Sequence, residues 1–266
     1  MSRYAQMFER LGGEGALGAF LMLGDPDLET SAALLDALVA GGADMVEVGI
    51  PFSDPVADGP VIQAASVRAL AKGVTPADCF ALLTHFRSRH PDIPVGLLTY
   101  ANIVVARGRE AFYEAARSAG VDSVLVADAP VMEAEPFAAA ARAHGIDPVL
   151  IAAPNTPEAT LRRVAELGQG YTYCVARAGV TGTETEMALN HGTLLETLKR
   201  HDAPPPVLGF GISRPEHVRA ALDAGAAGVI SGSAIVKLIE SEADAIGAVR
   251  AFVATMKEAT MTVTSR

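Results

Sequence analysis

Three acidic residues stand out in the segment VEVGIPFSDPVADG, which runs from Val46 to Gly59. Glu47 lies inside an apolar run typical of a buried strand, and Asp54 and Asp58 lie in the proline-rich loop that follows. An unpaired carboxylate inside a protein costs several kcal/mol, so a buried acid indicates either a cation beside it or a function. Singly, Asp54 or Asp58 is typical of a turn or a helix cap, but together with Glu47 they supply the paired carboxyl groups that proton transfer on a neutral substrate requires.

Three later segments carry glycines that can expose backbone N–H groups. They surround Gly182, Gly211 and Gly232, and Ser233 after the last glycine opens a predicted short helix. Glycine lets the backbone approach a ligand, and free N–H groups at a helix start favour anions, so we expect a phosphate site. The alternative is that these glycines only serve tight turns and that Ser233 only caps a helix. Dinucleotide, nucleoside-triphosphate and serine-hydrolase motifs are absent from the sequence.

The remaining aromatic and metal-binding residue types give weaker signals. Tyr100 and Tyr173, at the ends of two predicted strands, are either core residues or the floor of a pocket for a flat aromatic ligand. None of the six histidines pairs with another at metal-ligand spacing, so we interpret them as surface residues and predict no metal site. The two cysteines, Cys79 and Cys174, provide no disulfide framework.

Eight alternating strand and helix units must position these residues. Short apolar runs predict strands at Ala16–Leu23, Met45–Gly49, Val95–Tyr100, Ser123–Ala127, Pro148–Ala152, Tyr171–Ala176, Val207–Phe210 and Gly228–Ser231. Most are apolar on both faces, as expected for a parallel sheet covered by helices. Glycines that end helices precede three of the strands, and an extra helix is expected from about Ala5 to Leu11.

Capping signals mark several predicted helix starts. Thr75 and Thr156 each precede a proline that suits the first helical position. Ser213 and Glu216 have the spacing of a capping box.

No linker, low-complexity segment or charge block divides the 266 residues. We therefore predict one α/β domain over residues 1–266, a (β/α)₈ TIM barrel with an extra N-terminal helix and a short helix after strand eight at the phosphate site. A doubly wound open sheet is the alternative. In a barrel, the chemistry lies at the C-terminal ends of the strands.

The overall composition excludes several classes of protein. The formal net charge of −10 disfavours nucleic-acid binding, and a hydrophobic content of 50% excludes disorder over most of the length. The longest run without a charged residue, Ile93–Ala106, is too short for a membrane span. The N-terminal segment lacks the apolar stretch of a signal peptide, so we expect a cytoplasmic protein.

Taken together, these segments resemble the alpha subunit family of tryptophan synthase. The resemblance covers about Tyr4 to Phe252 and includes, in the family's order and spacing, GAFLMLGDPD, VEVGIPFSDPVADG, LLTYANIV, VLVADAPV, YTYCVARAGVTG, GFGIS and SGSAIVK. It implies a lyase that cleaves indole-3-glycerol phosphate to indole and glyceraldehyde 3-phosphate by a retro-aldol reaction, without a metal or organic cofactor in this chain. It assigns Glu47 as the acid and base at indole C3 and Asp58 as the partner of the indole N–H.

The same resemblance implies substrate-binding residues. The indole pocket would be lined by Phe20, Ile62, Tyr100 and Tyr173. The phosphate would be bound around Gly182, Phe210, Gly211, Gly232 and Ser233, and Thr181 would belong to a loop that closes over the site. The acidic segment at 183–190 departs from what we expect of that loop.

The resemblance also implies a partner. The family pairs with a beta subunit that holds pyridoxal phosphate (PLP), in an αββα heterotetramer in which indole passes between the subunits. Asp54 and Pro55 would lie toward that interface. A stand-alone lyase of the same family and a non-catalytic regulatory subunit are alternatives. A Schiff-base aldolase on the same barrel would need a lysine at a strand end, and none is present in the eight predicted strands.

Overall fold

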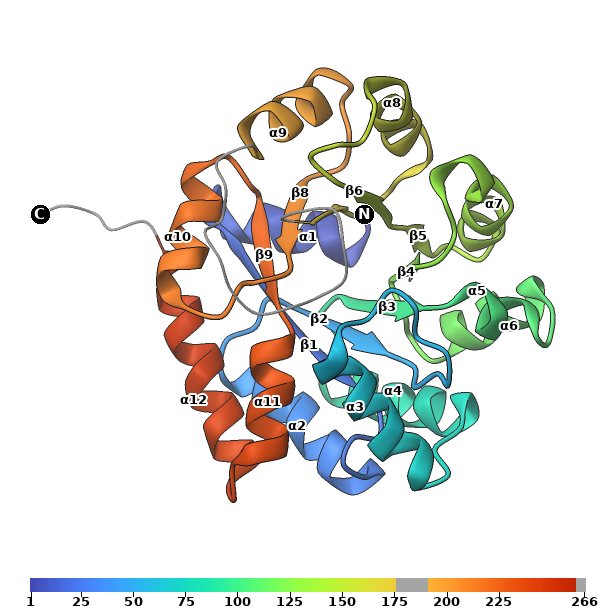
Figure 1. Cartoon of the computed structure of the whole chain (residues 1–266), viewed down its shortest axis with the longest axis vertical. Helices are drawn as coiled ribbons and strands as arrows, with labels where there is room; N and C mark the ends of the chain where they lie inside the picture. Colours follow the sequence, from blue (N-terminus) through green and yellow to red (C-terminus); the bar gives the residue numbers. More distant parts are fainter. Residues whose placement is uncertain (176–190, 262–266) are drawn as a thin grey trace, which may run out of the picture.

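The computed structural model describes residues 1–175 and 191–261, and it shows helices around a central ring of parallel strands (Figure 1). The strands are β1 (Ala16–Met22), β2 (Met45–Gly49), β3 (Val95–Thr99), β4 (Ser123–Val126), β5 (Asp147–Pro148), β6 (Leu150–Ala152), β7 (Thr172–Val175), β8 (Pro206–Gly209) and β9 (Gly228–Ser231). The predicted strands are therefore present, with ends that differ by a residue or two.

The ring closes through the fifth predicted strand, which is divided at Val149. Its first part, β5, pairs with β4, and its second part, β6, pairs with β7. The sheet order β5-β4-β3-β2-β1-β9-β8-β7-β6 therefore begins and ends on one continuous piece of chain. The predicted (β/α)₈ barrel is confirmed, and the open-sheet alternative is wrong.

Helices follow nearly every strand and cover the outside of the barrel (Figure 1). They are α1 (Arg3–Leu11), α2 (Leu28–Ala40), α3 (Pro60–Ala71), α4 (Pro76–Arg89), α5 (Ala101–Val105), α6 (Arg109–Ser118), the 3₁₀ turn η1 (Val131–Glu133), α7 (Glu135–Ala143), α8 (Glu158–Leu167), α9 (His191–Arg200), α10 (Pro215–Asp223), α11 (Ser233–Ser241) and α12 (Ala245–Glu258). The extra N-terminal helix is α1, and the short helix after the last strand is α11.

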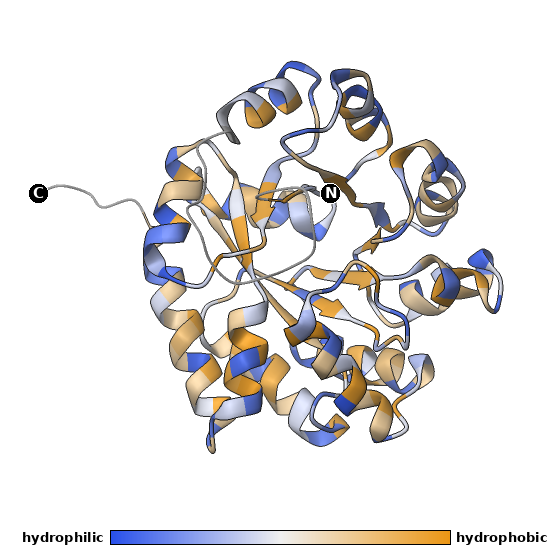
Figure 2. Cartoon of the chain, viewed as in Figure 1, coloured by the Kyte–Doolittle hydropathy of each residue, from blue (hydrophilic) through white to orange (hydrophobic). Residues whose placement is uncertain are grey.

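Two large apolar clusters form most of the core, and a third, small one consists of Ala134, Ala138 and Leu167. One lies between the strands and the surrounding helices and includes Leu34, Val48 and Leu97. The other includes Phe20 and Met45, whose strand neighbours of opposite orientation belong to the first cluster, so it fills the barrel interior. In Figure 2 the hydrophobic colour follows the strands and the helix faces turned toward them.

Helix α1 covers the N-terminal end of the barrel. Its Tyr4 and Met7 are buried in the interior cluster. The Tyr4 hydroxyl lies 2.8 Å from Ser123 Oγ, and Arg3 Nη1 donates to Asp122 Oδ1 at 2.7 Å. These contacts join α1 to the start of β4 and leave the opposite end of the barrel to the strand-to-helix loops.

One predicted capping signal is confirmed and two are wrong. Thr75 forms a full capping box with Asp78 at the start of α4. Helix α8 begins after Pro157, and Thr156 Oγ1 instead accepts a hydrogen bond from the Ala153 amide. Helix α10 has Arg214 at its N-cap, so the residue three positions later is His217 rather than Glu216, and the predicted box with Ser213 does not form.

Within residues 1–175 and 191–261, no helix has the length and hydropathy needed to cross a membrane.

Candidate active site

Glu47 projects from the middle of β2 into the barrel interior. It lies in register with Phe20 of β1 and Gly96 of β3, and side chains in register on parallel strands point to the same face. The carboxyl group is almost fully buried, with 2% of the residue exposed. The Tyr171 hydroxyl donates a hydrogen bond to Glu47 Oε1 at 2.8 Å.

A glycine makes room for the hydroxyl groups below Glu47. A Cβ atom at Gly96 would lie 3.0 Å from the Tyr4 hydroxyl and 3.4 Å from the Tyr171 hydroxyl. The rings of these two tyrosines are in contact, with centroids 5.3 Å apart. Helix α1 therefore reaches Glu47 through Tyr4 and Tyr171, from the end of the barrel opposite the loops.

Burial dominates the electrostatics of Glu47. Desolvation raises the pKa of its carboxyl group to about 7, the hydrogen bond from Tyr171 opposes this rise, and the charge of Asp58 adds to it. A carboxylic acid with a pKa near neutral pH can give up and take back a proton during a reaction.

Asp58 closes the loop after β2 and is held by Tyr100. The Tyr100 hydroxyl donates to Asp58 Oδ2 at 2.9 Å and accepts from the Ala57 amide at 3.2 Å. Phe52 stacks on the Tyr100 ring, with centroids 5.1 Å apart. Asp58 is 7% exposed, and burial raises the pKa of its carboxyl group to about 6, against the hydrogen bond from Tyr100. Each acid thus has a tyrosine hydroxyl as its partner.

Aromatic and aliphatic side chains adjoin the two acids. Phe20, Ile62 and Tyr173 belong to the same buried interior cluster, and Phe210 packs against it. A Cβ atom at Gly209 would overlap the Tyr173 hydroxyl, so the absence of a side chain there creates the space for this ring. Burial raises the pKa of Tyr173, and the charges of Glu47 and Asp58 raise it further.

The predicted phosphate-binding glycines after β8 and β9 are neighbours. Phe210 and Gly211 are both left-handed, with φ of 67° and 78°, which bends the chain sharply after β8. Ser231 Oγ donates to the Ile212 carbonyl at 2.6 Å and joins this bend to the end of β9. Gly232 is the N-cap of α11 and Ser233 its first residue, so the first amides of this helix have no partner within it.

Part of the predicted site lies outside the described residues. Thr181 and Gly182 belong to the segment 176–190, as does the acidic stretch 183–190.

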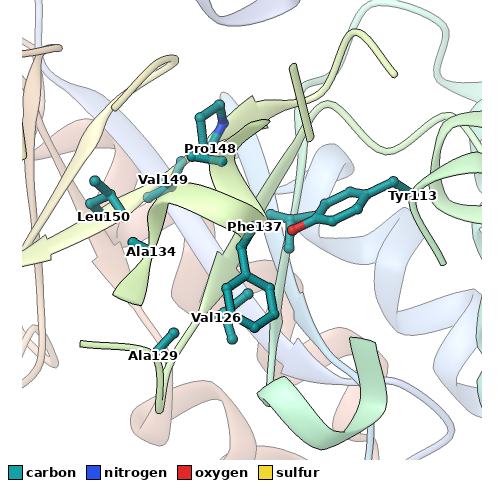
Figure 3. A pocket seen from close by; sticks show the side chains of 10 residues that line it. Tyr113, Val126, Ala129, Ala134, Phe137, Pro148, Val149 and Leu150 are labelled. Atoms are coloured by element: carbon teal, nitrogen blue, oxygen red, sulfur yellow. The ribbon is translucent and has the colours of Figure 1, made fainter. Parts of the chain in front are cut away.

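Figure 3 shows a different cavity, of about 20 Å³, between α6, α7 and the strands β4, β5 and β6. Its lining includes Tyr113, Phe137 and Leu150 but neither acid. It is a small packing gap away from the carboxyl groups. Within the described part of the chain, no three histidine, cysteine or acidic side chains are placed to hold a metal ion.

The sequence analysis missed the residues that hold the two acids. Tyr171 was seen only as the first residue of a strand, and Tyr4 was not considered. One signal was available, because Tyr171, just before β7, and Tyr173, within it, are two positions apart in a predicted strand and both belong to the interior cluster. Tyr100 was predicted as a pocket residue, but its hydroxyl also binds Asp58.

Comparisons with known proteins identify the family of the chain. A family model for the tryptophan synthase alpha chain matches residues 8–263. The chain is 55% identical to the tryptophan synthase alpha chain of Aeromonas hydrophila, over 91% of both chains. It is 53% identical to that of Shewanella amazonensis, over 98% of this chain and all of the relative.

A solved structure supports the same relationship. The chain superposes with a TM-score of 0.85 and 36% identity on a chain of the tryptophan synthase α2β2 complex of Pyrococcus furiosus, covering 92% of this chain and 99% of that one. The match to the family model and the identity to relatives both extend over nearly the whole length. The chain therefore belongs to the tryptophan synthase alpha chain family, and it is a lyase that cleaves indole-3-glycerol phosphate to indole and glyceraldehyde 3-phosphate.

Proposed function

We propose that Glu47 and Asp58 are the two catalytic residues of this cleavage. The observation that carries the proposal is their shared environment: both carboxyl groups are buried, both have raised pKa values, and each is held by a tyrosine hydroxyl. Among residues 1–175 and 191–261, no basic side chain contributes to either shift. Buried acids of this kind are typical of groups that exchange protons with a substrate.

The reaction requires one proton to be delivered and another to be removed. Protonated Glu47 gives its proton to indole C3, which turns the ring into an indolenine cation. The resulting carboxylate takes the proton of the adjacent glycerol hydroxyl as the carbonyl forms. The electrons of the broken carbon–carbon bond return to the ring, and Glu47 ends the cycle protonated. Ionised Asp58 accepts a hydrogen bond from the indole N–H and stabilises the cation.

The buried cluster binds the indole part of the substrate, and the glycine bends bind its phosphate group. The cluster provides an apolar surface for the indole ring, formed by Phe20, Ile62, Tyr100 and Tyr173. The bends at Phe210, Gly211, Gly232 and Ser233 provide amides for the phosphate. From the family resemblance we also assign Gly182 to the phosphate site and Thr181 to a segment that closes over it. Since Glu47 carries out both proton transfers and Asp58 supplies the counter-charge, we expect no cofactor in this chain.

The partner that we propose is a tryptophan synthase beta subunit carrying PLP, in an αββα assembly in the cytoplasm. A related chain forms such a complex in Pyrococcus furiosus. Three consecutive segments after strands β2, β3 and β4 also present large exposed apolar side chains, Val56, Val105 and Met132. Exposed apolar groups gathered at the catalytic end of a barrel favour an interface there. Asp54 and Pro55 adjoin Val56 and would couple this interface to Asp58.

The first test is indole release from indole-3-glycerol phosphate by the purified chain, with and without a beta subunit. We expect slow release that accelerates when the beta subunit is added. Fast release by the chain alone would favour a stand-alone lyase instead. If the folded chain released no indole in either condition, the regulatory-subunit alternative would replace a catalytic role.

A matched pair of variants tests the interface. Met132→Asp should weaken activation by the beta subunit and leave the basal rate unchanged, because it places a charge on the proposed interface. Val67→Asp is the control, since Val67 is 65% exposed on α3 and away from the three segments. Equal activation of both variants would contradict this interface.

A further inference from the structure

The bend after β8 carries a basic side chain beside the proposed phosphate site. The segment between β8 and α10 runs from Phe210 to Arg214, and the Arg214 side chain is exposed. The bond from Ser231 Oγ to the Ile212 carbonyl holds this segment next to the strand that leads into Gly232. Arg214 is thus three residues from Gly211 on a loop whose path is restrained.

The contacts of Arg214 leave a hydrogen-bond donor without an acceptor. Arg214 Nε and Nη2 lie 3.3 Å and 3.0 Å from Nε2 of His217, and the Ser213 amide donates to Nδ1 of the same ring at 3.3 Å. A neutral imidazole has only one acceptor nitrogen, and a protonated one has none. The ring can therefore satisfy either the Ser213 amide or the Arg214 guanidinium, but not both.

The charges on the neighbouring segments indicate what the Arg214 guanidinium binds. Between the strand end and the next helix, the segments after β1, β2, β8 and β9 contain four aspartates. Asp25 is buried and paired with Arg68 of α3, which leaves Asp27, Asp54 and Asp58 as the acidic groups of the rim. Arg214 is the one basic residue in these four segments. An acidic rim on a chain of net charge −10 repels a phosphorylated substrate, and a cation on the phosphate side of the rim counteracts this repulsion.

We propose that Arg214 is a further substrate-binding residue, which attracts the phosphate group and binds it together with the Ser213 amide. This inference rests on the proposed function, because it extends the phosphate site of the same reaction. His217 holds the guanidinium near the bend, and the phosphate oxygens supply the acceptors that the imidazole lacks. Rotation of the long arginine side chain moves the charge from His217 toward Gly211.

The test compares Arg214→Gln with Arg219→Gln, which removes the same charge from an exposed position on α10, the helix that Arg214 precedes. Indole release by the full chain with its beta subunit gives kcat and KM, and calorimetric titration with inorganic phosphate gives a dissociation constant without catalysis. For Arg214→Gln we expect KM and the dissociation constant to rise about fivefold at low ionic strength, with kcat unchanged, and the difference to shrink as salt is added. Arg219→Gln should match the wild type.

Two outcomes would overturn the inference. One is an equal effect of both substitutions, which would reduce the role of Arg214 to net charge. The other is unchanged KM and phosphate affinity in Arg214→Gln. His217→Ala adds a check, because phosphate affinity should be kept or increased once the ring no longer holds the guanidinium. If the wild type released no indole, the proposed function would fail, and the phosphate titration would still decide the role of Arg214.

Discussion

The start of β4 and the site around β2 hold buried acids in opposite ways. Before β4, at the N-terminal end of the barrel, the Asp122 carboxylate accepts from Arg3 at 2.7 Å, from Arg87 at 2.7 Å and from the Val95 amide at 2.8 Å. Glu47 in β2 and Asp58 in the loop after it are also buried, but tyrosine hydroxyls are their hydrogen-bond partners.

The partner of a buried acid decides whether the acid serves stability or function. A buried carboxylate between two guanidinium groups has its charge paired and joins the elements that it contacts, here α1, α4 and β3. A buried carboxyl group without a cation gains a raised pKa and becomes able to exchange protons, at a cost to stability. Barrels commonly place conserved stability at the bottom and chemistry at the top of the strands, and the partners of these three acids give that division a physical basis.

The largest expected effect is on activity at the C-terminal end. Glu47→Gln removes the proton donor while keeping the shape of the side chain, so cleavage should fall roughly a thousandfold or more. Asp58→Asn should cause a similar loss, because the indolenine cation loses its counter-charge. Both variants should keep the wild-type far-ultraviolet circular dichroism. Wild-type turnover in either variant would remove its assigned role.

The matching substitution at the N-terminal end should affect stability instead. Arg87 donates to Asp122 and to the carbonyls of Ile93 and Gly120. Arg87→Met leaves these buried acceptors short of donors and should lower the free energy of unfolding by about 4 kcal/mol, with kcat unchanged. Urea denaturation and steady-state rates measure the two quantities. A large loss of kcat in a folded Arg87→Met protein would contradict the assignment of stability to the Asp122 site and of activity to the site of Glu47 and Asp58.

The raised pKa of Glu47 predicts a pH dependence of stability. The folded protein binds this proton more tightly than the unfolded chain, so the contribution is complete below pH 4.5 and is lost as the pH rises through 7. Glu47→Gln, which cannot ionise, should therefore be more stable than the wild type at pH 8, by on the order of 3 kcal/mol, and lose this advantage toward pH 5. Urea denaturation at both pH values measures the difference. The control Glu216→Gln, an exposed position on α10, should show none.

The smallest effect concerns the tyrosine that holds Glu47. The rate constant kcat/KM should rise as Asp58 ionises near pH 6 and fall as Glu47 loses its proton near pH 7. Tyr171→Phe removes the hydrogen bond that lowers the pKa of Glu47, so the alkaline limb should move upward by about one pH unit. A merely structural role of Tyr171 would lower the rate without moving this limb.

The sequence predicted most of the fold because the signals were local and repeated. Apolar runs of strand length, separated by helices and closed by glycines such as Gly120 and Gly225 with φ of 80° and 99°, indicate a barrel wherever they occur eight times. The cap at Thr75 was correct because its partner is three residues away. The caps at Thr156 and Ser213 were wrong because each helix begins one residue later than the motif implied. Thr156 Oγ1 instead accepts a hydrogen bond from the Ala153 amide.

Glu47 was singled out from residue type and position alone, because an acid in an apolar strand is energetically anomalous wherever the chain goes. Asp58 was chosen over Asp54 by the family resemblance, because the loop carries both acids. Their partners could not be found in this way. Tyr171 is 124 positions from Glu47, and Tyr100 is 42 from Asp58. Barrel closure brings them together, and the missing side chain of Gly96 leaves room for Tyr4 and Tyr171. The sequence by itself determined which acids are candidates for the chemistry, and the tertiary structure decided their pKa values, because those depend on burial and on hydroxyls supplied by residues far away in the sequence.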